Sequence, residues 1–138
     1  MRLWIPTIVF CIALIGAAKA EEARQPTTPK GMVESFLGLI GKGQVDPALK
    51  ALLAGSPIMA QPAQVQNLGN QIQGATSLYG KSLGYELYKE EKFGESLVRL
   101  VYIQRLEKHP LIWRFWVYRG PADWQVNSVV FNDQLSFE

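Results

Sequence analysis

Between Ser96 and Arg119, two runs of mostly apolar side chains, each interrupted by arginines, lie on either side of a short turn. Both halves are rich in Val, Ile, Tyr, Phe and Trp, which suit a pleated and half-buried surface. The turn lies at residues 107–110, where Pro110 cannot donate to a central ladder of hydrogen bonds. The pattern predicts a β-hairpin, and it is the least ambiguous structural signal in the chain.

The length of the hairpin loop decides which side chains share a face. With an even loop of about two or four residues, even-numbered residues of the first strand lie beside odd-numbered residues of the second. One face is then apolar and is expected to form the core: Val98, Leu100, Tyr102, Trp113, Phe115 and Val117. The other face mixes arginines with apolar and aromatic side chains: Leu97, Arg99, Val101, Ile103, Arg105, Ile112, Arg114, Trp116 and Tyr118. An odd loop would invert one half and put Trp116 inside.

The same alternation predicts one further strand on each side of the hairpin. A two-residue turn at Phe93-Gly94 would pair it with an earlier strand, residues 84–91. That strand places Tyr85 and Leu87 on the core side, and it places three residues on the arginine side: Glu86, Tyr88 and Glu90. A turn at residues 120–123 leads into a last strand, whose expected core side is Trp124, Val126, Ser128 and Val130. Its expected outward side is Gln125, Asn127, Val129 and Phe131.

Before residue 80, apolar side chains recur at helical spacing. Thr28 suits the cap of a helix that begins at Pro29 and ends at residues 41–43. Its apolar face is Met32, Val33, Phe36, Leu37 and Ile40. A short helix from Asp46 and a longer one at residues 61–78 follow. Three helices before a four-stranded antiparallel sheet predict a single α+β domain over residues 30–138, with the helices on one face of the sheet.

The first twenty residues are expected to be a signal peptide. Arg2 precedes an apolar stretch, and residues 18–20 read A-K-A, a typical cleavage site. A membrane helix needs about 20 apolar residues, whereas Pro6 interrupts a shorter run here. Residues 21–29 would then be a linker. The only cysteine, Cys11, leaves with the signal peptide, so we expect no thiol chemistry, and we expect export to a bacterial periplasm or otherwise secretion.

Charge narrows the range of partners. The 14 basic side chains include Arg2 and Lys19 of the predicted signal peptide, so the mature chain balances its 12 acidic side chains. No basic stripe of the kind that binds a phosphate backbone is present in the sequence. We therefore expect no nucleic-acid binding, and no membrane attachment after signal cleavage.

The order of the elements resembles the NTF2-like, cystatin-like superfamily of α+β cones. The resemblance rests on GLIGKGQVDPALKALL (38–53), on the strands within residues 79–119, and on W-x-V-x-S-x-x-F-x-D-x-L (124–135). It covers most of residues 30–137, and the chain looks most like small exported members with no assigned activity. It departs from many members because no strand pair lies between the second and third helices. The resemblance implies helices packed into a strongly curved sheet, and a dimer formed through the outer face of that sheet.

Candidate catalytic groups are few. Enzymes of the superfamily, as the resemblance implies, place a carboxylate or a His–Asp pair inside the cone, but the predicted core face has neither. The hydroxyls of Tyr85 and Tyr102 could together donate to an oxyanion, although a bond to a backbone carbonyl is the favoured interpretation. The only histidine, His109, lies in a turn, and no second His or Cys is present to complete a zinc site in the mature chain. The sequence predicts no enzyme, no cofactor and no metal site.

Two binding surfaces remain as hypotheses. The arginine-bearing face has the composition of interface hot spots, so we expect a homodimer or a protein partner to use it. Its candidate residues are Arg99, Ile103, Arg114, Trp116, Tyr118 and Tyr88. The alternative is carriage of a small apolar ligand in the cone, with these candidate contacts: Tyr85, Tyr102, Trp113, Trp124, Phe36 and Met32. An isomerase- or hydratase-like enzyme is a third hypothesis and would require an acid inside the cone. The main prediction is an exported, non-enzymatic binding module.

Overall fold

A computed structural model describes residues 28–137, so the predicted signal peptide, Cys11 and nearly all of the predicted linker lie outside the described residues. The elements, in chain order, are α1 (Pro29–Gly41), α2 (Val45–Leu52), the 3-10 helix η1 (Pro57–Ala60), α3 (Pro62–Tyr79), β1 (Ser82–Phe93), β2 (Leu97–Leu106), β3 (Pro110–Arg119) and β4 (Trp124–Asn132). The strands form one antiparallel sheet in the order β1-β2-β3-β4. The predicted α+β class, with helices before a four-stranded antiparallel sheet, is confirmed.

Short polar side chains fix where the helices begin. The Thr28 hydroxyl accepts a hydrogen bond from the backbone N–H of Gly31 (3.1 Å), and Pro29 takes the first helical position of α1, as predicted. Ser56 caps η1 in the same way by accepting from the N–H of Ile58 (3.2 Å). The buried Ser56 hydroxyl also donates to the carbonyl of Val126. This second bond ties the start of η1 to β4.

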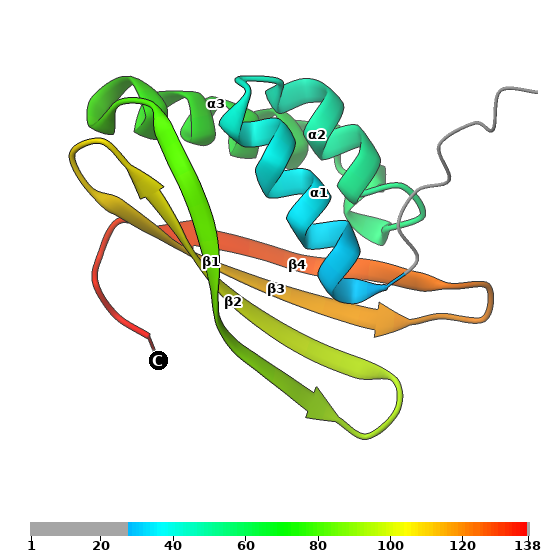
Figure 1. The fold of residues 1–138 in the computed structure, drawn as a ribbon. Coiled ribbons are helices and arrows are strands. Elements are labelled where there is room, and N and C mark those ends of the chain that lie inside the picture. Colours follow the sequence, from blue (N-terminus) through cyan, green and yellow to red (C-terminus); the bar gives the residue numbers. More distant parts are fainter. Residues whose placement is uncertain (1–27, 138) are drawn as a thin grey trace, which may run out of the picture.

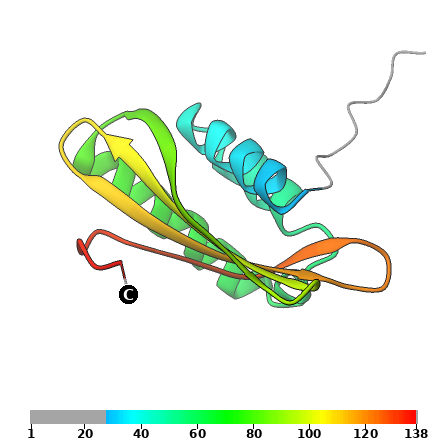
Figure 2. The same ribbon diagram turned by 60° about the horizontal axis from the view of Figure 1, so that its bottom comes forward.

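The three α-helices lie on one face of a strongly twisted sheet (Figures 1 and 2). The core forms where α1 meets the centre of the sheet. There, Phe36 packs edge-on against Trp113 and Phe115, with ring centroids 5.3 and 5.9 Å away. Such edge-to-face pairs stabilise a core beyond the area that they bury. We call this side of the sheet the helix side.

The register of the central hairpin confirms the predicted faces. Arg105 pairs with Pro110, which leaves an even loop of four residues, 106–109. Tyr102 therefore lies opposite Trp113 on the helix side. Arg99 lies opposite Trp116 on the other side, which we call the outer face. Trp116 is thus outside the core, as the even loop predicts.

The predicted faces of β1 are right in one half of the strand and wrong in the other. Three residues, 94–96, connect β1 to β2 in place of the predicted two-residue turn, and Gly94 adopts a φ of 64°. The odd loop inverts the faces of the part of β1 next to it. A bulge at Tyr88 then shifts the register by one residue and returns the rest of the strand to its predicted side. Consequently Glu90, predicted on the arginine side, lies opposite Leu100 on the helix side, and Glu91 lies opposite Arg99 on the outer face. Tyr85 and Leu87 keep their predicted side. Strict alternation could not anticipate a bulge, because a bulge breaks the period of two.

A second bulge changes the faces of β4. Arg119 pairs with Trp124 across the predicted turn at residues 120–123, and Val126 lies on its predicted side, facing the helices opposite Val117. Beyond the bulge at Asn127 the sides exchange. Ser128 and Val130 face outward, and Val129 and Phe131 face the helices, opposite to the prediction. As a result, the Phe131 ring stacks on the Trp113 ring, with the ring centroids 4.6 Å apart. This favourable aromatic contact could not be predicted from alternation along the strand.

The C-terminal tail, residues 133–137, turns back under the sheet on the side away from the helices (Figures 1 and 2). Arg114 donates from Nη2 to the carbonyl of Ser136 (2.7 Å). The ring of Phe137 lies 4.5 Å from that of Tyr88. The tail therefore covers part of the outer face.

Candidate functional site

The centre of the helix side is filled with side chains. Trp113 and Tyr102 are fully buried, and Trp113 donates from its indole N–H to Gln104 Oε1 (2.9 Å). Gln104 in turn donates from Nε2 to the hydroxyl of Ser82 (3.3 Å). Two of the six side chains that we expected around a ligand, Trp113 and Tyr102, therefore belong to the packed core.

One acid reaches this core, and the sequence analysis missed it. The Tyr102 hydroxyl donates to Glu34 Oε1 of α1 (3.1 Å). Burial, and then the bond to Glu34, raise the pKa of Tyr102 above its usual value. Glu34 is partly buried and follows the buried Val33 in α1, at the edge of its apolar face, and this position was the signal that could have revealed it. Tyr85, another expected ligand contact, packs edge-on at 6.0 Å from Tyr102 and remains 37% exposed.

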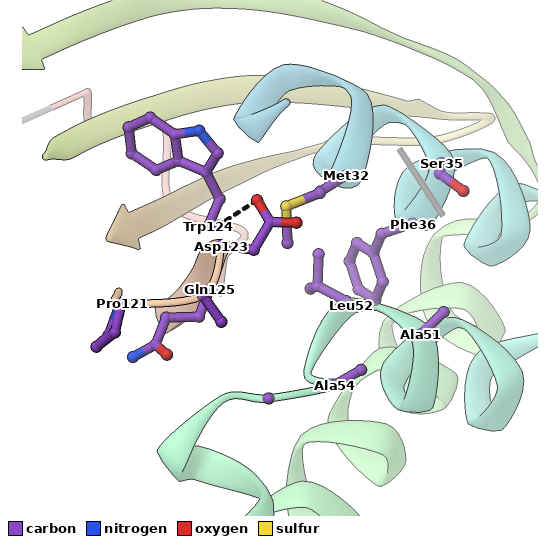
Figure 3. Close-up of a pocket in the computed structure, with 12 residues that line it drawn as sticks. Met32, Ser35, Phe36, Ala51, Leu52, Ala54, Pro121, Asp123, Trp124 and Gln125 are labelled. Atoms are coloured by element: carbon purple, nitrogen blue, oxygen red, sulfur yellow. Dashed lines mark hydrogen bonds between the residues drawn. The ribbon is translucent and has the colours of Figure 1, made fainter. Parts of the chain in front are cut away.

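A cleft of about 420 Å³ opens beside this core, between the helices and the turn that joins β3 to β4 (Figure 3). The other three expected ligand contacts, Met32, Phe36 and Trp124, all line it. Sequence reasoning did not find the rest of the lining: Ser35, Ala51, Leu52, Ala54, Gly55, Pro121, Ala122, Asp123 and Gln125. These residues come from α1, from the end of α2 and its connection to η1, and from the β3–β4 turn with the start of β4, so only the tertiary fold brings them together.

Hydrogen bonds fix the β3–β4 side of the cleft. Asp123 Oδ1 accepts from the backbone N–H of Trp124 (2.7 Å), and the carbonyl of Asp123 accepts from the N–H of Gly120 (2.9 Å). The guanidinium of Arg119 lies 5.9 Å from the centre of the Trp124 ring. Asp123 shapes the turn that was predicted at residues 120–123, and the turn positions Trp124 at the start of β4.

The outer face carries a second candidate surface near the β1–β2 loop. We call Phe93, Arg99, Trp116 and Tyr118 the aromatic patch. The Phe93 and Trp116 rings lie 5.4 Å apart, and the Arg99 guanidinium lies 5.6 Å from the Trp116 ring. Phe93 is 44% exposed and Tyr118 is 40% exposed. The β1 register, which the sequence analysis had wrong, is what adds Phe93 to this patch.

An ion pair holds the arginine of the patch in place. Arg99 donates from Nη2 to Glu91 Oε1, and Lys89 Nζ lies 3.3 Å from the same oxygen. The hydrogen bond from Arg99 lowers the pKa of Glu91, and Lys89 adds to this effect. Arg99 thus stays over the Trp116 ring as a partly neutralised cation.

The remaining expected interface residues lie elsewhere on the outer face. The tail contacts Arg114 and Tyr88, so neither is fully open to a partner. Ile103 pairs with Ile112, farther from the β1–β2 loop. The structure brings Arg99, Trp116 and Tyr118 together and separates them from Tyr88, Ile103 and Arg114.

His109 takes part in holding the start of the tail. Its ring stacks on Tyr79 at 4.8 Å, and its Nε2 lies 2.6 Å from the carbonyl of Asp133. The Tyr79 hydroxyl donates to Asp133 Oδ2 (2.5 Å), and this bond raises the pKa of Tyr79. The half-buried imidazole therefore joins the end of α3 to the end of β4, and is less solvated than its place in a turn suggested.

In residues 28–137, no three His, Cys, Asp or Glu side chains converge in a geometry that could hold a metal ion. None of the helices described is long and apolar enough to cross a membrane. Comparison with known protein families, with curated proteins and with solved structures found no match for this chain.

Proposed function

We propose that the protein is an exported, non-enzymatic binding module of the NTF2-like, cystatin-like type, and that it forms a homodimer through the aromatic patch. The observation that carries the proposal is the exposure of Phe93 and Tyr118 beside Trp116 and Arg99. Clustered exposed aromatic side chains beside an arginine are typical of protein interfaces. The core of such an interface excludes water from side chains of this kind.

A second copy of the chain is the partner that best suits this surface. A two-fold dimer brings the same patch together from both copies, so Trp116 and Tyr118 of one chain can pack on those of the other. The balanced charge of the predicted mature chain gives no net repulsion between copies. Because the tail covers Arg114 and Tyr88, the contact is centred near the β1–β2 loop.

The test is the mass of the mature protein in solution, measured by size-exclusion chromatography with light scattering. We expect twice the chain mass for the wild type, and a single chain mass for Trp116→Glu and for Tyr118→Glu, because each places a charge in the interface. Leu78→Glu is the matched control, since Leu78 is 61% exposed on α3, away from the patch. A wild-type monomer at high concentration, or a dimer that survives both patch substitutions, would refute the proposal.

Carriage of a small apolar ligand is a second candidate function, and the cleft favours it. Its volume of about 420 Å³ falls within the range of about 300–1,000 Å³ typical of small-molecule pockets. Native mass spectrometry of protein purified from its own host measures stoichiometry and any retained ligand together. A reproducible extra mass supports a carrier, and ligand-free chains that also bind no added apolar compound argue against one. Sequencing the N-terminus of the same sample tests export, because cleavage after Ala20 predicts Glu21 as the first residue.

A further inference from the structure

We propose that the cleft selects amphipathic amines, that is, small molecules with an apolar body and a positively charged head group. The proposal rests on the second candidate function, carriage of a small ligand, and adds the chemical class of that ligand. It is carried by the distribution of apolar and charged side chains around the cleft.

The walls of the cleft suit an apolar body. Met32 and Phe36 of α1, together with Leu52 of α2, form one side, and the Trp124 indole stands on the β4 side (Figure 3). Methionine is flexible and polarisable, so Met32 can adapt to bodies of different shape. An alkyl or phenylalkyl chain placed here would exchange water for contact with these side chains.

The charge of the cleft comes from one residue. Asp123 is the only charged side chain among the twelve residues that line it, and Ser35 and Gln125 are the other polar ones. Asp123 Oδ1 is used by the backbone N–H of Trp124. Within residues 28–137, no hydrogen bond or ion pair engages its Oδ2, so this oxygen can accept from a ligand. Hydrogen bonds between an ammonium and a carboxylate are among the stronger ones in proteins, whereas a ligand carboxylate would meet a like charge.

Arg119 is a nearby cation whose positive charge would repel an amine, but its position keeps it away from the cleft. Its guanidinium lies over the Trp124 ring at 5.9 Å, and it is not among the residues that line the cleft. Both ion pairs formed by residues 28–137 involve Glu91, so Arg119 does not pair with Asp123. Because Arg119 already uses the indole as a cation–π partner, the ligand's charge is expected at Asp123 and its apolar body against Trp124.

The test is isothermal titration calorimetry of the mature protein with three probes that share one body: phenylbutylamine, phenylbutanol and phenylbutyrate. At neutral pH we expect the amine to bind about tenfold more tightly than the alcohol, and the carboxylate to bind most weakly. This comparison uses the wild-type protein alone, so it does not depend on any variant folding.

Asp123→Asn sharpens the test. Asparagine keeps an oxygen that can accept from the N–H of Trp124, so the turn is retained while the charge is lost. We expect the variant to bind the amine about tenfold more weakly, at the level of the alcohol, with alcohol binding unchanged. Glu86→Gln, which removes an acid from the outer face, is the matched control and should change neither.

The outcomes separate this proposal from the function on which it rests. Equal binding of amine and alcohol, or an amine affinity that Asp123→Asn leaves unchanged, overturns the selection of amines and leaves carriage of an apolar ligand standing. Tighter binding of the carboxylate also overturns it. Failure of all three probes to bind refutes both the amine selection and carriage of ligands of this size.

Discussion

Two tryptophans three residues apart in β3 show how differently the two faces of the sheet are built. Trp113, on the helix side, is fully buried, and its indole N–H is bonded to Gln104. Trp116, on the outer face, is half-buried between Phe93 and the Arg99 guanidinium. The same residue type fills the core on one side and contributes to an exposed patch on the other.

The difference follows from what covers each face. Three helices cover one side, and Phe36 closes the aromatic core there. On the other side the five-residue tail covers only part of the surface, around Arg114 and Tyr88. Aromatic side chains beyond the tail keep an exposed surface, so recognition is expected on the outer face and at the cleft, where the packing of the helix side ends.

Truncating the two tryptophans should separate the faces most clearly. Trp113→Ala should lower the free energy of unfolding by about 3–5 kcal/mol, because it leaves a cavity in a packed core. Trp116→Ala should cost only about 1 kcal/mol, since neighbouring side chains and water can fill the space. Urea unfolding monitored by circular dichroism measures both values in the monomeric state. Equal losses would contradict the assignment of the two faces.

Replacing Gln104 tests whether the buried hydrogen bonds of the helix side matter as well as its packing. Gln104→Leu leaves the indole N–H of Trp113 buried without an acceptor, so we expect a loss of about 1–3 kcal/mol. The control is Gln66→Leu on the exposed side of α3, which should stay within about 0.5 kcal/mol of the wild type. A loss for Gln104→Leu no greater than that of the control would show that the bond to Trp113 contributes nothing.

A smaller effect should appear on the outer face when the pH is lowered. The pKa of Glu91 lies below its ordinary value of 4.5, because Arg99 bonds to its charged form. As the pH falls, the Glu91 carboxylate is therefore protonated at a higher pH in the unfolded chain than in the folded chain. The contribution of Glu91 is therefore complete above the ordinary value and is lost as the pH falls through the lowered pKa.

Glu91→Gln should weaken the pH dependence of unfolding in that acidic range. Glu86→Gln should leave it unchanged, because within residues 28–137 the Glu86 carboxylate forms no ion pair. Urea unfolding across a series of acidic buffers measures the effect. Parallel pH profiles for the wild type and Glu91→Gln would show that the ion pair does not couple to folding.

The sequence predicted much of this arrangement because its signals are local. The Thr28 cap, the helical spacing of α1 and the alternation in β2 and β3 each depend on neighbours along the chain. An even loop between β2 and β3 then sufficed to assign Trp113 and Trp116 to opposite faces. Of the six ligand contacts expected inside the cone, Met32, Phe36 and Trp124 line the cleft.

The tertiary structure decided the features that depend on distant contacts. The three-residue β1–β2 loop together with the bulge at Tyr88 places Phe93 beside Trp116, and the bulge at Asn127 places Phe131 on Trp113; no alternating pattern could foresee either contact. The carboxylate of Asp123 lines a cleft because the β3–β4 turn lies across from α1. A period of two or of 3.6 residues fixes which side of an element a residue occupies. What lies across from that side depends on how the elements pack, and that packing gives this protein its cleft and its aromatic patch.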